Sequence, residues 1–138
     1  MRRLGSDFDA AYPWRFPAVL ERVVDGDTFV ATIDQGMRSY QSGVWIRIAA
    51  VSCPEKRGLE RAKGLIAMQG LRNLLRESSD APLIIQPLAE DSFRRWVSIV
   101  WAAGIEVNDW LVVNGLAKPW DYGREPRPCF PDDEAFPL

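Results

Sequence analysis

Five short runs rich in β-branched and aromatic residues, with one helical run inserted after the third, constrain the fold of this chain most. The strand-like runs cover residues 16–24, 28–33, 43–51, 81–89 and 94–103. Between the third and the fourth, residues 59–77 repeat apolar side chains at helical spacing. This order is typical of a small closed barrel of the OB type. The sequence therefore predicts a mainly β, α+β fold, a five-stranded OB-fold barrel with two or so packed helices.

Three local signals refine this prediction. Residues 104–117 have apolar residues at helical spacing, with Asn108 suited to cap the start of a second helix. Gly115 is placed to end that helix, because glycine accepts the left-handed backbone of a C-terminal cap. Pro87 has no amide hydrogen to donate, so the fourth strand should lie near a sheet edge or carry a bulge there.

The length and composition suit one globular domain. With 138 residues, 47% of them hydrophobic, the chain can bury a real core. We expect an N-terminal extension over residues 1–15, a folded domain over 16–122 and a Pro-rich, acidic tail over 123–138. No signal-peptide core or membrane-length run is present in the sequence. Two cysteines without metal-ligand spacing fit a reducing compartment, so we expect a cytoplasmic protein, monomeric by default.

The absence of histidine narrows the chemistry that the chain can perform. It removes imidazole acid–base catalysis, serine–histidine triads and most zinc sites. Any catalysis must use carboxylates, Arg, Lys, Tyr, Cys or a hard metal. Because the net charge is −2 and the pI is about 5.2, binding of nucleic acid would need a local basic patch.

Two stretches carry charged residues where the chain otherwise reads as buried strand. Asp25 and Asp27 flank a glycine between the first two strands, and Asp-Gly alone is a common hairpin signal, since glycine accepts positive φ and aspartate caps the turn. Arg47 alternates with isoleucines, so its side chain points to the opposite face from theirs. Taken singly, Arg47 would be solvated or would pair with a carboxylate such as Glu55.

The order of the motifs is more specific than any one of them. The chain presents VVDGDT, RIAAVSCPE, a helix, DSFRRWVSIVW and VNDWLVVNGLAKP in succession. From about residue 17 to residue 122, this closely resembles the staphylococcal nuclease (thermonuclease) family. The resemblance implies an OB-fold barrel and a Ca²⁺-dependent phosphodiesterase that acts on DNA and RNA. It matches Asp27 with the family's calcium carboxylate and Glu55 with its catalytic glutamate. It matches Arg47 and Arg95 with the two catalytic arginines.

The chain departs from the family pattern at the metal site. Ser52 stands where the family has a second calcium carboxylate, and Cys53 stands where a threonine contributes its backbone carbonyl. Because Ser52 removes a negative charge, the resemblance implies weaker binding of Ca²⁺, or of another divalent cation. Trp120 and Tyr122 occupy the region where the family has base-stacking tyrosines. Either aromatic could instead anchor the tail.

Two neighbouring positions leave alternatives open. Arg94 and Trp96 replace the small residues that usually surround the second catalytic arginine, so their bulk could shift Arg95 or narrow the cleft. Asp25 either orients the turn through local hydrogen bonds or supports the metal ligands from outside the coordination sphere. We favour the turn role for Asp25.

These observations lead to one expected function and one alternative. We expect a cytoplasmic nuclease that uses Ca²⁺ or another divalent cation to hydrolyse phosphodiester bonds in DNA and/or RNA, with no membrane partner. The alternative is a catalytically degenerate OB-fold module that binds nucleic acid or a protein without cleavage. Ser52 and the acidic pI favour the module, whereas the four other matched residues favour the enzyme.

Overall fold

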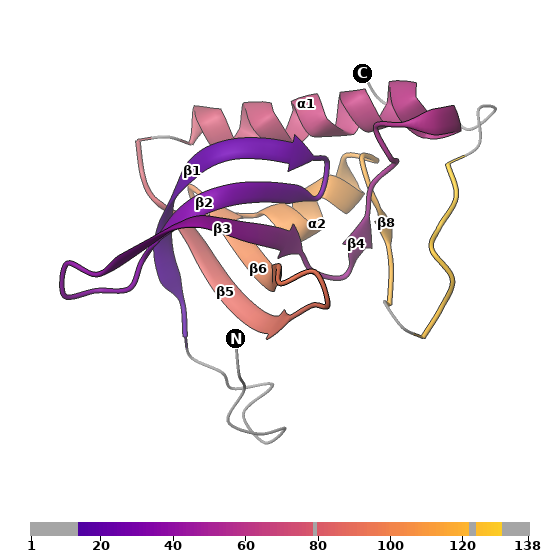
Figure 1. Cartoon of the computed structure of the whole chain (residues 1–138). Helices are drawn as coiled ribbons and strands as arrows, with labels where there is room; N and C mark the ends of the chain where they lie inside the picture. The colour runs from indigo at the N-terminus through magenta and orange to yellow at the C-terminus, as the bar shows by residue number, and fades with distance from the viewer. Residues whose placement is uncertain (1–13, 79, 122–123, 131–138) are drawn as a thin grey trace.

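The barrel is built from five strands and is closed. The computed structural model describes residues 14–78, 80–121 and 124–130 (Figure 1). The barrel strands are β1 (Phe16–Asp25), β2 (Thr28–Asp34), β3 (Tyr40–Ile48), β5 (Leu83–Glu90) and β6 (Trp96–Ala102). Antiparallel pairing joins β3, β2, β1, β5 and β6 in that order, and parallel pairing of β3 with β6 closes the ring. The predicted five-stranded, OB-like barrel is confirmed.

The third strand, β3, begins and ends three residues earlier than the predicted range of 43–51. It ends at Ile48, because Ala50 has a φ of 63° and turns the chain out of the barrel. The strand β4 (Val51–Ser52) then pairs with β8 (Lys118–Pro119) in a separate two-stranded sheet. A further short strand, β7 (Ile105–Glu106), extends the sheet beyond β6.

Alternation along the strands places the core inside the barrel. In β6, every second residue from Trp96 to Ala102 is buried, as a strand with one face inward requires. Large apolar side chains from the other strands meet it there: Phe29, Ile33, Ile46, Ile48 and Ile85. Burial of these side chains stabilises the barrel by about 1.5–3 kcal/mol each.

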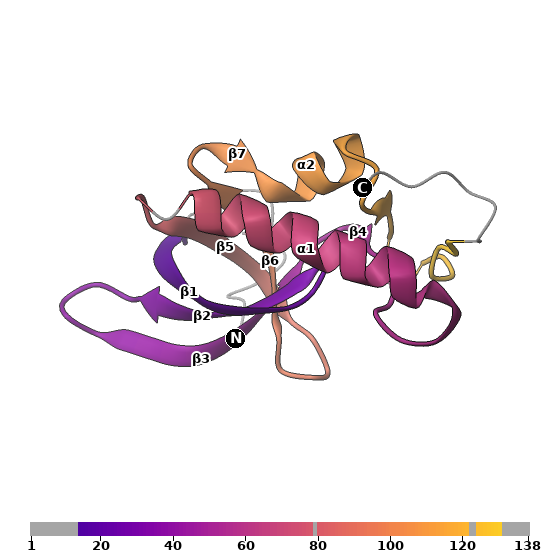
Figure 2. The same cartoon turned by 90° about the horizontal axis from the view of Figure 1, so that it is seen from above.

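Two helices cover the barrel, as predicted. The helix α1 (Arg61–Glu77) follows a short 3₁₀ turn, η2 (Gly58–Glu60), and lies across the barrel strands (Figure 2). It buries Ala67, Leu71, Leu74 and Leu75. The second helix is α2 (Val107–Val113), which packs against β6. Within the part of the chain that the structure describes, neither helix has both the length and the apolar character to cross a membrane.

The local signals differ in their outcome. Gly115 has a φ of 71° just after α2, and the N–H of Leu116 bonds to the carbonyl of Leu111 at 2.9 Å, which confirms the predicted cap. Pro87 lies at a register shift of β5 against β6, which confirms the bulge. The capping role of Asn108 is wrong, because α2 begins one residue earlier and the Asn108 side chain is buried among backbone groups.

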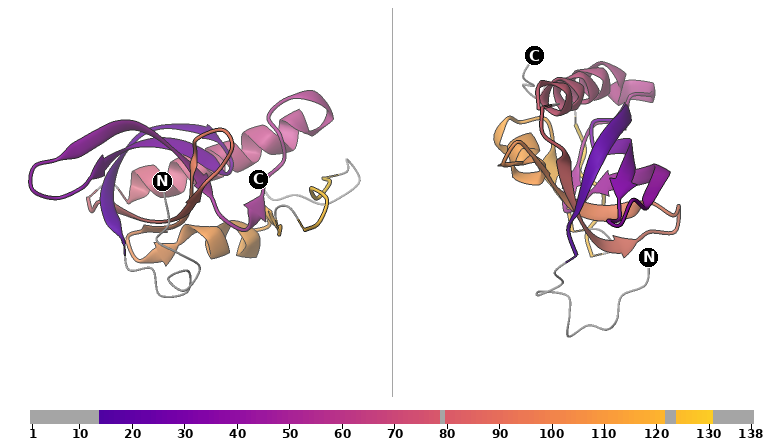
Figure 3. Two further views of the ribbon diagram at one scale, coloured as in Figure 1. Left: turned by 60° about the horizontal axis from the view of Figure 1, so that its bottom comes forward. Right: turned by 90° about the vertical axis from the view of Figure 1, so that its left-hand side faces the viewer.

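The described part of the C-terminal tail, residues 124–130, packs beside β8 and the segment before α1. Phe130 is only 4% exposed, and Lys118 lies 4.9 Å from its ring centre. The Lys118 ammonium also donates to the carbonyl of Cys129 at 2.7 Å. Figure 3 shows this segment at the opposite end of the molecule from the loop that joins β2 and β3. Packing of Phe130 therefore fixes these residues beside β8.

Candidate active site

One cavity brings together the described residues that the sequence singled out. It has a volume of about 470 Å³ and lies where the β1–β2 turn, the end of β3, the segment before α1 and the β5–β6 loop meet. Its walls include Asp27, Arg47, Ser52, Cys53, Glu55, Arg95 and Trp120. Tyr122 lies outside the described residues. Two acids, Asp27 and Glu55, and two arginines, Arg47 and Arg95, thus line the same cavity.

The turn that carries Asp27 is shaped by close packing. Asp25 pairs with Thr28 across the hairpin, so Gly26 and Asp27 form a two-residue turn. Gly26 keeps its φ outside the left-handed region, so the expected reason for a glycine there is wrong. A Cβ at Gly26 would instead lie 2.7 Å from the Cβ of Ala67 and 2.9 Å from that of Cys53. Glycine thus lets α1 pack directly on the turn.

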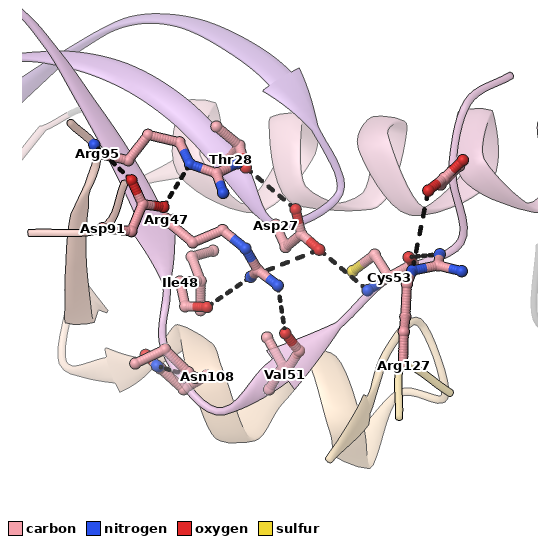
Figure 4. A network of polar contacts seen from close by, with 12 residues as sticks. Asp27, Thr28, Arg47, Ile48, Val51, Cys53, Asp91, Arg95, Asn108 and Arg127 are labelled. Atoms are coloured by element: carbon pink, nitrogen blue, oxygen red, sulfur yellow. Dashed lines mark hydrogen bonds and ion pairs between the residues drawn. The ribbon is translucent and has the colours of Figure 1, made fainter. Parts of the chain in front are cut away.

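The Asp27 carboxylate joins the turn to the opposite wall (Figure 4). Its Oδ1 accepts from the Thr28 hydroxyl at 3.1 Å, and its Oδ2 accepts from the backbone N–H of Cys53 at 3.0 Å. The same Oδ2 lies 3.5 Å from Nη1 of Arg47. Asp27 is therefore held in one orientation by groups from three segments.

Arg47 holds the corner where β3 ends. Its Nη1 donates to the carbonyl of Ile48 at 2.7 Å and its Nη2 to that of Val51 at 2.8 Å. The Arg47 side chain is 13% exposed. The guanidinium thus satisfies carbonyls at both sides of the corner at Ala50 and presents its charge to the cavity beside Asp27.

Arg95 lines the cavity and is held in place by the carboxylate of Asp91, a residue that the sequence analysis did not identify. Its Nε donates to Oδ2 of Asp91 at 2.8 Å, and its backbone N–H donates to Oδ1 at 2.9 Å. Burial raises the pKa of Asp91, but these hydrogen bonds outweigh that effect and lower the pKa overall. The signal in the sequence was an aspartate four residues before the arginine in a polar turn.

The neighbours of Arg95 leave the cleft open. Arg94 has a φ of 63° and lines a neighbouring groove rather than this cavity. Trp96 is 9% exposed and packs 6.3 Å from the ring of Phe16. Arg95 is therefore the arginine that faces the site, and the bulk of Trp96 lies in the core.

Glu55 has an exposed carboxylate on a fixed backbone. The side chain is 66% exposed, whereas the backbone N–H donates to Oε1 of Glu60 at 3.1 Å. A Cβ on Gly64 would collide with the Glu55 carbonyl, so glycine in the first turn of α1 lets this loop lie against the helix. The backbone is thus fixed while the carboxylate remains accessible.

Arg127, from the C-terminal segment, completes the cavity wall and was also missed. Its Nη2 donates to the Cys53 carbonyl and to Oε1 of Glu60, both at 2.9 Å. Its Nε lies 4.0 Å from Oε1 of Glu55. The hydrogen bond with Glu60 raises the pKa of Arg127, and the same bond lowers the pKa of Glu60. No spacing or periodicity in the Pro-rich tail marks this arginine.

The acids near the turn influence one another. Burial raises the pKa of Asp25, and the charge of Asp27 raises it further. Lys56 partly offsets both effects, and its ammonium donates to the carbonyl of Val24 at 2.7 Å. The cavity therefore concentrates negative charge at the turn and positive charge on the walls around it.

The cavity contains oxygen donors, which are the ligand type that a hard cation prefers. At the predicted metal position they are the Asp27 carboxylate, the Cys53 carbonyl and the Ser52 hydroxyl, and Ca²⁺ takes oxygen ligands. The carboxylates of Asp25, Glu55 and Asp91 also line the cavity. The donors at the predicted metal position are fewer than the oxygens, about 6–8, that Ca²⁺ takes. Among the residues described, no three Asp, Glu or Cys side chains gather to hold a metal. The donors at the predicted metal position are therefore of the right kind for a divalent cation but too few to fill its coordination shell on their own.

Comparison with known proteins does not assign this chain to a family. No protein-family model matches it. No curated protein matches it significantly.

Proposed function

We propose that this chain is a divalent-cation-dependent nuclease of the staphylococcal nuclease type that hydrolyses phosphodiester bonds in DNA and/or RNA. One observation carries the proposal: Asp27, Arg47, Glu55 and Arg95, from four separate segments, line a single cavity. Two acids and two arginines in one cavity are the groups that a site for metal-assisted phosphodiester hydrolysis needs.

Each of these residues has a role in the proposed reaction. Arg47 and Arg95 bind the phosphate and offset the charge that develops in the transition state, each contributing about 3–4 kcal/mol. Glu55 aligns or deprotonates the attacking water. Asp27, with oxygens of Ser52 and Cys53, would hold Ca²⁺ or another divalent cation, which supplies Lewis-acid polarisation of a phosphate oxygen when bound.

The charge of the cavity supports nucleic acid as the partner. The chain has a net charge of −2, yet the walls carry the cationic side chains Arg47, Lys56, Arg57, Arg95 and Arg127 against four acids. Trp120 lies in the same wall, which supports substrate contact, although its Nε1 also donates to the Glu125 carbonyl at 3.0 Å and so anchors the tail. We place the reaction in the cytoplasm, which two free cysteines support.

The alternative, an OB-fold module that binds without cleaving, has its own support. Arg95 is paired with Asp91, and Arg127 is bonded to the Cys53 carbonyl that a cation would need. Asp91 thus neutralises Arg95 at 2.8 Å and Glu60 neutralises Arg127 at 2.9 Å, which leaves less positive charge to stabilise a phosphate transition state and so favours a module that does not cleave.

The metal dependence of cleavage tests the proposal. We expect single-stranded DNA or RNA to be cut in the presence of Ca²⁺, Mg²⁺ or Mn²⁺ and to remain intact in EDTA. The protein supplies few charged ligands, so EDTA should remove the cation that the reaction needs. The measurement is fragment length on a denaturing gel at increasing metal concentration. Binding of the strand with no cleavage under any metal would reject the enzyme in favour of the module.

Ser52→Asp should tighten calcium binding by roughly tenfold, because affinity at oxygen sites follows the number of charged ligands. Ser52 is 1% exposed and close to Asp27, so the metal-free variant should be less stable through repulsion between two carboxylates. Calorimetric titration with Ca²⁺ and melting curves with and without Ca²⁺ separate the two effects.

The matched control for this change is Ser52→Asn, which has nearly the same shape as aspartate but no charge. It should be destabilised without any gain in affinity. Equal calcium affinity for the aspartate variant and the parent would show either that Asp27 is not a ligand or that the site is built differently from the family pattern.

A further inference from the structure

The Arg127 guanidinium lies at a point where several anionic groups converge. Glu60 binds it through both carboxylate oxygens, at 2.9 and 3.3 Å, and Glu55 lies 4.0 Å from its Nε. The Cys53 carbonyl accepts from the same Nη2 that binds Glu60. The cavity therefore already contains a cation, and that cation belongs to the chain.

The Cys53 carbonyl is also one of the oxygens assigned above to a divalent cation. The peptide N–H of Cys53 donates to Asp27, so the residue that carries this carbonyl is in direct contact with the proposed metal carboxylate, 26 residues earlier in the chain (Figure 4). An oxygen that accepts a guanidinium hydrogen bond at 2.9 Å has a positive charge directly against it. A second cation on that oxygen would be repelled at close range.

We propose that Arg127 sets the divalent-cation affinity of this cavity, because its guanidinium occupies the Cys53 carbonyl and must withdraw before a metal binds there. The inference rests on the cation site of the proposed function, not on hydrolysis. Because the two events are thermodynamically linked, docking of the segment around Arg127 weakens metal binding by the same factor by which bound metal weakens docking of the segment.

The neighbouring contacts explain why the guanidinium stays in place without metal. Phe130 is buried three residues later, and Lys118 binds the carbonyl of Cys129. These contacts dock the segment, while Glu60 orients the arginine. Withdrawal of Arg127 therefore has a cost that lowers the apparent metal affinity.

The test is calorimetric titration of the full chain with Ca²⁺ alone, comparing the parent with Arg127→Gln and Arg124→Gln. Arg124 is in the same segment, but its side chain is 84% exposed and pairs only with Asp121, at 3.8 Å, among the contacts described. We expect Arg127→Gln to bind Ca²⁺ about tenfold more tightly or better, since a like charge beside the site is removed. Arg124→Gln should match the parent.

A second measurement keeps the test informative if Arg127→Gln alters packing. In the parent, amide hydrogen exchange of Arg127, Cys129 and Phe130 should speed up on addition of Ca²⁺, whereas exchange in β2 should not change. Unchanged calcium affinity in Arg127→Gln, no binding by any of the proteins, or unchanged exchange with bound Ca²⁺ would each overturn the inference. A chain that follows the expected titrations but cuts no nucleic acid would reject the nuclease alone.

Discussion

We expect Glu55→Gln to lower the rate of DNA cleavage by about 10² to 10³ and to leave the stability of the fold unchanged. The carboxylate is 66% exposed, and its nearest ionic partner, Arg127, is 4.0 Å away. Its backbone N–H, which does hold the loop, is retained in the variant. The change therefore removes a proton acceptor and little else.

Single-turnover cleavage at saturating metal, together with a thermal melt, measures both expectations. Glu77→Gln is the matched control, because Glu77 is exposed at the far end of α1 and does not line the cavity. It should cleave at the parent rate. If Glu55→Gln also cleaved at the parent rate, Glu55 would have no catalytic role and the binding module would become the preferred function.

Arg47→Ala would be a less specific test of the same site. Arg47 faces the cavity, but its guanidinium also satisfies the carbonyls of Ile48 and Val51. Removing it leaves both groups without that donor, so activity and stability should fall together. Loss of activity in Arg47→Ala alone would not separate catalysis from folding.

Much of the fold follows from local patterns in the sequence. Alternation and turn residues predict the five strands, and helical spacing predicts both helices, because these signals act over a few neighbouring residues. The convergence of Asp27, Arg47 and Arg95 could also be predicted, since they lie at or near ends of strands that one barrel must bring together.

What the sequence could not predict depends on contacts between distant segments. Gly26 reads as a turn glycine, but its absent side chain makes room for α1. Arg127 reads as part of a Pro-rich tail, yet it binds Cys53, 74 residues earlier in the chain. Neither contact leaves a periodic or spacing signal, because each is decided by three-dimensional packing.

In the core, Asn108 is the clearest example of a contact between distant segments that the sequence does not predict. A polar residue at the start of a helical pattern predicts a cap, since caps commonly satisfy helix N–H groups. In the structure its Oδ1 accepts from the N–H of Val100 at 3.0 Å, and its Nδ2 donates to the carbonyl of Ala49 at 2.9 Å and to that of Ser98 at 3.3 Å. One buried amide thus joins α2 to β6 and to the residue that follows β3.

Asn108→Leu should destabilise the fold by about 3–5 kcal/mol, because a side chain of similar size leaves the buried groups of Ala49 and Val100 without their polar partner. Urea unfolding at neutral pH measures the change. Asn114→Ala is the control: its amide also binds a helix carbonyl, that of Trp110 at 2.8 Å, but it is exposed to water. That change should cost about 1 kcal/mol or less.

The loss at Asn108 should also reach the cavity. Ala49 lies between Ile48 and the corner at Ala50, and Arg47 binds carbonyls on both sides of that corner. Without the Asn108 amide to hold the Ala49 carbonyl, the corner at Ala50 should shift, and the Arg47 guanidinium that is bonded to it should shift too. Cleavage by the folded fraction of Asn108→Leu should therefore fall as well. Asn108→Asp keeps an acceptor for Val100 but loses the donor to Ala49, and it should also be destabilised. If Asn108→Leu unfolded at the same urea concentration as Asn114→Ala, the buried amide would not be what joins α2 to the barrel.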